Sequence, residues 1–218
     1  MTIVSFNKSD VCDDAGYFGM LGDFLTNHPD KISGVAAQGF SLRCDHELAG
    51  RCEVVSSFTA VLSAGKGVIE LFQATLDCDV RNAVYHSANF ICDFVDGIKF
   101  FETSDKAIPL PEKLVALAPF CEIGVCAVDI YHGISDLRAA GEGDKGFCEL
   151  RNRERKYTLV RNVLLAGVAA LGLTGVAMGA TALFGCSIAA LLLTMGAFFA
   201  KQQLKEYAIT NRSLTFSA

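Results

Sequence analysis

Histidine and cysteine are the side chains in this sequence that could bind a metal ion or act as a nucleophile. His86 and His132 fall on two segments with a helical repeat, and Cys92, Cys121 and Cys126 lie on the same two segments. Cys121 and Cys126 are five residues apart, so they do not share a helix face as paired zinc ligands would. Core thiols and histidines at the edge of the core explain this set better than a metal site, and we expect no cofactor.

Two glycine-rich stretches could in principle hold a phosphate group. SAGKGV (63–68) lacks the spacing of a phosphate loop and the hydroxyl that binds magnesium, and it lies inside a helical repeat. GEGDKG (141–146) follows no predicted strand and is typical of a linker. No nucleophile elbow supports a hydrolase. We therefore expect a protein that is not an enzyme, with a soluble helical enzyme as the less favoured alternative.

The nine cysteines indicate a reducing compartment. Their number is odd, no C-x-x-C occurs, and one of them lies inside an apolar run. The N-terminus has neither a basic region nor an apolar core of the kind that a secretory signal needs. Free thiols are the better interpretation than a disulfide framework.

Residues 162–200 form a run of thirty-nine residues without Asp, Glu, Lys or Arg. One helix of that length would measure about 58 Å, whereas the hydrocarbon core of a bilayer is about 30 Å thick. Two helices fit better, and we predict them over 163–178 and 182–200 with a turn at MGAT (178–181) or at FGC (184–186). The turn either crosses the far leaflet or stays within it as a re-entrant hairpin.

Small residues at intervals of four would let the two predicted membrane helices pack closely. The candidate packing and turn residues are Gly167, Gly175, Gly179, Ala182, Cys186 and Ala190. The soluble alternative is a helical hairpin buried in a water-soluble core. Neither predicted helix has a polar face, and a chain of this length offers little material to enclose two such helices.

Basic residues flank the apolar run on both sides. They are Arg151, Arg153, Arg155, Lys156 and Arg161 before it, and Lys201 and Lys205 after it. Residues 1–148 carry a net charge of −10 and residues 149–218 a net charge of +5. Because positive residues stay on the cytoplasmic side, both ends of the hairpin should lie there, facing membrane lipid. The basic charge is too sparse to indicate nucleic-acid binding.

Three segments before the run, 52–75, 80–102 and 114–137, repeat apolar residues every three or four positions, as an amphipathic helix does. The first has its stripe at Val54, Val55, Phe58, Val61, Leu62, Gly65, Val68, Ile69 and Phe72. We expect the three helices to pack as a small bundle, with a kink or a later start at Pro119. Their acidic character disfavours lipid contact and leaves contact with a protein partner open.

These observations predict an all-α protein: a small amphipathic helical bundle followed by a C-terminal two-helix transmembrane hairpin. Residues 1–50 should be an irregular lead with one short helix around 17–25, because glycines interrupt every apolar stretch. Residues 51–140 should form the cytosol-facing domain, 141–161 a linker and basic flank, 162–200 the hairpin and 201–218 a basic tail.

The paired apolar lobes with a minimal turn resemble those of the inclusion membrane proteins of Chlamydiae. That resemblance covers residues 162–200. It implies export by type III secretion through an uncleaved N-terminal signal, a place in the host vacuole membrane with both termini in the cytosol, and recruitment of host proteins or contact between copies.

A looser resemblance links RNAVYHSANFICDFVDGIKFFE (81–102) and YTLVRNVLL (157–165) to peroxisomal membrane-shaping proteins of the peroxin-11 type. Those proteins depend on a strongly basic amphipathic helix, which the acidic segments here lack. We therefore expect a membrane-anchored adaptor that presents residues 51–140 to protein partners or to another copy of itself. A membrane-remodelling protein is the alternative.

Overall fold

The computed structural model describes residues 14–102, 112–139, 145–174 and 178–215. Over these residues every regular element is a helix, so the predicted all-α class is confirmed. The helices are α1 (Asp14–Asn27), α2 (Pro29–Leu42), α3 (His46–Leu76), α4 (Val80–Glu102), α5 (Glu112–Ala139), α6 (Lys145–Leu173) and α7 (Ala180–Thr215).

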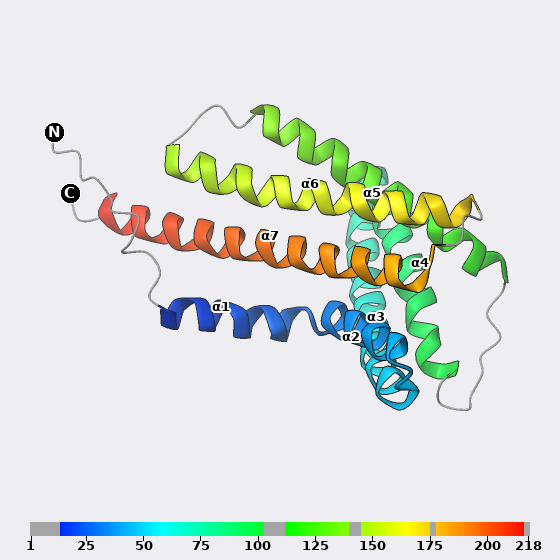
Figure 1. Ribbon diagram of the computed structural model, residues 1–218. Helices are drawn as coiled ribbons and strands as arrows, with labels where there is room; N and C mark the ends of the chain where they lie inside the picture. Colours follow the sequence, from blue (N-terminus) through cyan, green and yellow to red (C-terminus); the bar gives the residue numbers. More distant parts are fainter. Residues whose placement is uncertain (1–13, 103–111, 140–144, 175–177, 216–218) are drawn as a thin grey trace.

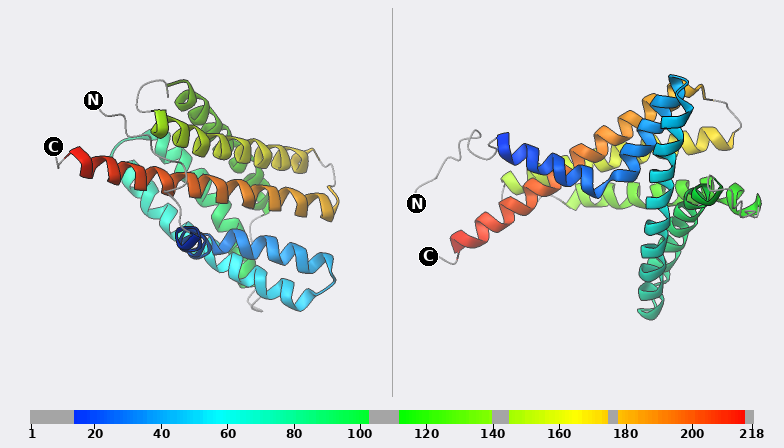
Figure 2. Two further views of the ribbon diagram at one scale, coloured as in Figure 1. Left: turned by 60° about the vertical axis from the view of Figure 1, so that its left-hand side comes forward. Right: turned by 90° about the horizontal axis from the view of Figure 1, so that it is seen from below.

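From α2 to α7 each helix packs against the next, and α2 also packs against α7, which closes the arrangement into a ring of contacts. The helices α6 and α7 lie side by side along most of their length (Figure 1). The pair α3 and α4 crosses them at a steep angle and projects as an arm in the view from below (Figure 2).

The molecule has two opposite ends, defined by the helices that start or finish there. The terminal end is where α1 begins and α7 finishes (Figure 1). The loop end is opposite, where α6 finishes and α7 begins (Figure 1). The C-terminal part of α2 reaches the loop end, because a Cβ on Gly39 would lie 3.3 Å from the ring of Phe184 near the start of α7.

Two tight turns of the same design bracket α3. Cys44 and Cys78 have φ of 60° and 54°, in the left-handed region, and each directly follows the C-cap residue of a helix, Arg43 for α2 and Asp77 for α3. The amide of the next residue then bonds back across the helix end, from Asp45 to Phe40 O at 3.0 Å and from Asp79 to Ala74 O at 2.9 Å. Each aspartate also caps the following helix through its side chain. The predicted break at 77–79 is confirmed.

The expectation of an irregular lead over residues 1–50 is wrong for the part that the structure describes. Residues 14–42 form α1 and α2, and α3 has begun by His46. Gly16, Gly19 and Gly22 have open space around them, so they weaken α1 without blocking it. Contact with another helix compensates for the low helix propensity of these glycines, since the ring of Phe24 packs on Phe198 and Phe199 of α7.

The boundaries around the apolar run also differ from the prediction. The basic flank is not a linker, because α6 starts at Lys145 and continues through it into the apolar segment. The first apolar helix ends at Leu173, five residues early, and α7 continues past Ala200 to Thr215. The break precedes Ala180, and the alternative turn at 184–186 lies inside α7. Pro119 lies within a continuous α5.

Candidate membrane-facing surface

Except for Val61, which contacts Gly97 of α4, the apolar stripe of α3 faces away from the rest of the molecule. Its large side chains stand well exposed, including Leu62 at 58%, Ile69 at 60% and Phe72 at 63%. Val54, Phe58 and Leu76 continue the same face. From Val54 to Leu76 the stripe covers twenty-three residues of helix, and the rise from the first to the last is about 33 Å. The helices α3, α4 and α5 pack in sequence as expected, but most of the large side chains of the α3 stripe lie outside that contact.

The face of α3 that turns inward consists of small residues. Its buried positions are Ala49, Ser57, Ala64, Gly67 and Ala74. Gly97 of α4 approaches α3 so closely that a Cβ there would lie 2.9 Å from Val61 Cγ2 and 3.1 Å from Val61 N. Small side chains thus bring α3 and α4 into close backbone contact, the type of packing found between helices in membranes.

The more polar helix α4 is the enclosed one. From Tyr85 to Ile98 every residue except Phe94 and Asp96 is buried or half-buried, because α3 packs on one side and α5 on the other. Its polar groups have partners inside the molecule: His86 Nδ1 lies 3.2 Å from Glu70 Oε2 of α3. Glu70 also pairs with Lys66 at 3.3 Å, the ion pair that interrupts the apolar surface of α3.

A polar junction ties α4, α5 and α6 together. The Tyr85 hydroxyl donates to Asp129 Oδ1 at 2.9 Å, and the Asn162 amide lies 3.4 Å from Asp129 Oδ2. The Arg161 guanidinium donates to Asn162 Oδ1 at 2.9 and 3.1 Å. Asn162 is 2% exposed, so the junction supplies hydrogen bonds to a side chain that would otherwise be costly to bury.

The predicted packing and turn residues of the hairpin have different surroundings. Gly167 and Gly179 have open space where a Cβ would be, Ala182 is exposed, and Cys186 and Ala190 are half-buried; Gly175 lies outside the described residues. The close contacts come from two tyrosines that cover glycines. Tyr157 of α6 lies 3.1 Å from a Cβ built on Gly196, and Tyr207 of α7 lies 3.1 Å from one on Gly146. A tyrosine on one helix facing a glycine on the other is the sequence signal that could have identified this contact.

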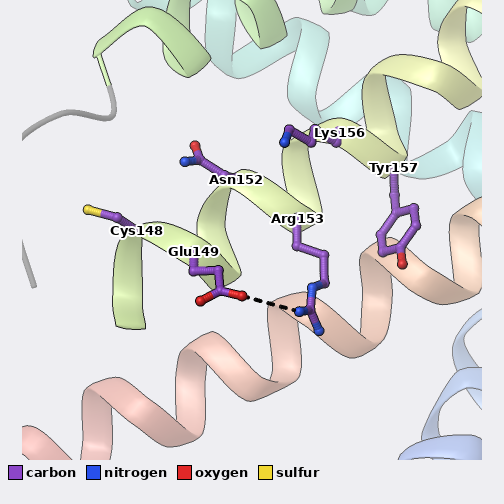
Figure 3. A pocket seen from close by; sticks show the side chains of 6 residues that line it. All are labelled: Cys148, Glu149, Asn152, Arg153, Lys156 and Tyr157. Carbon is purple, nitrogen blue, oxygen red and sulfur yellow. Dashed lines mark ion pairs between the residues drawn. The ribbon is translucent and has the colours of Figure 1, made fainter. Parts of the chain in front are cut away.

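The basic flank forms the first half of α6. Glu149 pairs with Arg153 at 3.5 Å, and these two residues line a pocket of about 570 Å³ together with Cys148, Asn152, Lys156 and Tyr157 (Figure 3). Arg151, Arg153 and Lys156 are exposed on α6, as are Lys201 and Lys205 on α7. Arg155 and Arg161 are half-buried. Because α6 and α7 are antiparallel, both sets of cations lie toward the terminal end.

Within the part of the chain that the structure describes, four helices are long and apolar enough to cross a membrane: α3, α5 over Ala116–Ser135, α6 over Gly146–Leu173 and α7 over Ala180–Ile209. The prediction from sequence allowed for two. Large apolar side chains on the outside of α5, α6 and α7 include Phe120, Val163 and Leu192.

The histidines and cysteines that could have bound a metal are separated. His86 pairs with Glu70, His132 contacts Arg81, and the Cys92 thiol lies 3.6 Å from the backbone carbonyl of Ala118. Across the described ranges no three of His, Cys, Asp or Glu are grouped to hold a metal ion. The eight cysteines within them are free thiols.

Comparison with protein families, with curated proteins and with solved structures finds no match to this chain.

Proposed function

We propose that this chain is an integral membrane protein that acts as a structural adaptor, with the outer faces of α3, α5, α6 and α7 covered by lipid. One observation carries the proposal: large apolar side chains lie outside and small ones inside. Of the twelve buried apolar residues that the structure describes, seven are alanines, whereas Phe58, Leu62 and Phe72 are exposed. Water-soluble bundles bury their large apolar residues, because that burial drives their folding.

The dimensions of α3 support a crossing. Its apolar stripe of about 33 Å matches a hydrocarbon core of about 30 Å. Charged residues lie at both ends of the stripe, Glu47, Arg51 and Glu53 before it and Asp77 and Asp79 after it. Inside the stripe, Lys66 and Glu70 neutralise each other as an ion pair, which reduces the cost of their position.

The cations of α6 and α7 support an orientation. Since basic residues remain on the cytoplasmic side, the terminal end faces the cytosol and the loop end faces the other side. The start of α1 and the end of α7 lie together at the terminal end (Figure 1), which agrees with both termini on one side. The parts of the chain beyond the lipid are then available to protein partners or to another copy.

Within this proposal the chain belongs with the type III secreted inclusion membrane proteins that its apolar run resembles. Support comes from two antiparallel apolar helices with a connection of only six residues, 174–179. A translocation assay tests the proposed type III secretion. It compares export of the full chain with a C-terminal reporter from a type III-competent host and from its secretion-defective mutant. Equal export from both would contradict it.

Alkaline carbonate extraction of membranes that contain the full chain tests membrane integration. An integral membrane protein is expected to stay in the pellet. Release into the supernatant would contradict the proposal and would favour a soluble helical protein. Tubulation of vesicles by the purified protein would instead favour the membrane-remodelling alternative.

A further inference from the structure

An apolar groove runs between α4 and α5, on the outside of the molecule. Its volume is about 700 Å³, within the usual range of ligand sites. Both helices line it with the same spacing: Val80, Arg81, Val84, Tyr85 and Ala88 on α4, and Phe120, Cys121, Gly124, Val125 and Val128 on α5. Val80, Val84 and Phe120 are more than half exposed, so the groove lacks a cover.

One end of the groove is cationic. The Arg81 side chain contacts His132 Nε2, and among the described residues it makes no ion pair with a carboxylate. The other polar group in the lining, the Tyr85 hydroxyl, already donates to Asp129. A guanidinium with no carboxylate partner among the described residues, at the end of an apolar groove, is complementary to a ligand with one anionic end and an apolar body.

The groove, extended to His132 beyond its last lining residue on α5, Val128, has about the length of one leaflet. From Phe120 to His132 α5 advances twelve residues, or about 18 Å, close to half of a core about 30 Å thick. The apolar segment of α5 ends at Ser135, three residues beyond His132. Arg81 and His132 therefore lie near the depth of the lipid headgroups, on the side of α3 that ends at Leu76.

We propose that this groove binds an acyl chain of an anionic phospholipid, with the lipid phosphate at Arg81 and His132. The inference rests on the proposed membrane integration, and it adds a site that selects among lipids. The orientation proposed above puts Arg81 in the cytoplasmic leaflet, where anionic lipids are concentrated.

Native mass spectrometry of the full chain tests the proposal. The protein is incubated with phosphatidylglycerol, phosphatidylcholine or oleate and then released from detergent. The expected result is one retained phosphatidylglycerol, with at least about fivefold preference over phosphatidylcholine, as one interfacial arginine contributes about 1 kcal/mol. Oleate should not displace it. Equal retention of the two phospholipids, or a preference for oleate, would overturn the proposal, as would a dimer that excludes lipid.

Two variants with matched controls locate the site. Arg81→Gln should remove the headgroup preference, while Arg51→Gln, which removes an exposed cation from the far part of α3, should keep it. Gly124→Leu fills the groove, and Gly65→Leu makes the same change on α3; neither Cβ has a neighbour within 4 Å. Only Gly124→Leu should lower retention of phosphatidylglycerol. Unchanged retention in both groove variants would overturn the assignment.

The two proposals fail in different ways. Release of the unmodified chain by carbonate would contradict membrane integration. A chain that stays in the carbonate pellet but retains no phosphatidylglycerol would contradict the lipid site alone.

Discussion

At the scale of single residues, contacts at glycine and asparagine decide how closely the helices pack. Gly97 lets α4 approach the backbone of α3 at Val61, and Asn162 fills the junction between α5 and α6 with a hydrogen-bonded polar group. Neither position follows from hydrophobic periodicity, because a repeat of apolar residues does not say which small or polar residue meets another helix.

Gly97→Ala should destabilise the protein by roughly 1 to 3 kcal/mol. The new Cβ would lie 2.9 Å from Val61 Cγ2 and 3.1 Å from Val61 N, and the backbone atom cannot move without shifting the helix. Gly65→Ala is the control, because open space surrounds it and alanine favours a helix by up to about 1 kcal/mol. Thermal unfolding in detergent measures both, and a Gly97→Ala variant as stable as Gly65→Ala would contradict the close approach.

Asn162→Ala should cost about 1 kcal/mol, since it removes a partner of Asp129 and of Arg161 from a buried position. Asn152→Ala, ten residues earlier on α6, provides the comparison. Within the described residues its buried Oδ1 has no hydrogen-bond partner, so alanine there should change stability by no more than about 0.5 kcal/mol. The same unfolding measurement applies, and equal losses would show that the junction contributes nothing.

At the scale of elements, much of the helical pattern could be predicted from the sequence. The predicted helix over 80–102 matches α4, and the break at 77–79 lies where α3 gives way to α4. The stripe of α3 was correctly identified as one face, but periodicity gives a face without saying whether protein, lipid or water covers it. The short helix expected around 17–25 lies within α1, whereas α2 and the early start of α3 were missed because glycines interrupt their apolar stretches.

Leu62→Arg tests what covers α3. Beside lipid, an arginine near the middle of a membrane helix costs about 2.5 to 3.5 kcal/mol on the insertion scale. On a solvated face the same change would alter stability by no more than about 0.5 kcal/mol. Denaturation of the detergent-solubilised protein would miss this difference, so the assay should measure insertion of α3 into a membrane. The readout is the side of the membrane from which Cys44 is accessible. Insertion at the level of the unmodified protein would count against lipid contact.

At the scale of the whole molecule, the inverted distribution of side chains is the main result that sequence could not supply. Composition suggested an acidic, solvated domain at residues 51–140 beside a membrane hairpin. Instead, the polar helix α4 is enclosed between α3 and α5, and the apolar faces of its neighbours point outward. The proposed membrane part therefore includes much of the segment that the sequence assigned to the cytosol.

The two turns that bracket α3 give the most direct test of whether α3 crosses a membrane. Cys44 and Cys78 are both exposed, and they lie at opposite ends of α3. Each variant keeps one of these two cysteines, and all the other cysteines are replaced by serine or alanine. The variants are placed in sealed, oriented membranes and treated with a maleimide that does not cross the bilayer. We predict labelling of Cys78 from the cytosolic side and of Cys44 only after the membrane is opened. Labelling of both from the same side of an intact membrane would contradict a crossing by α3.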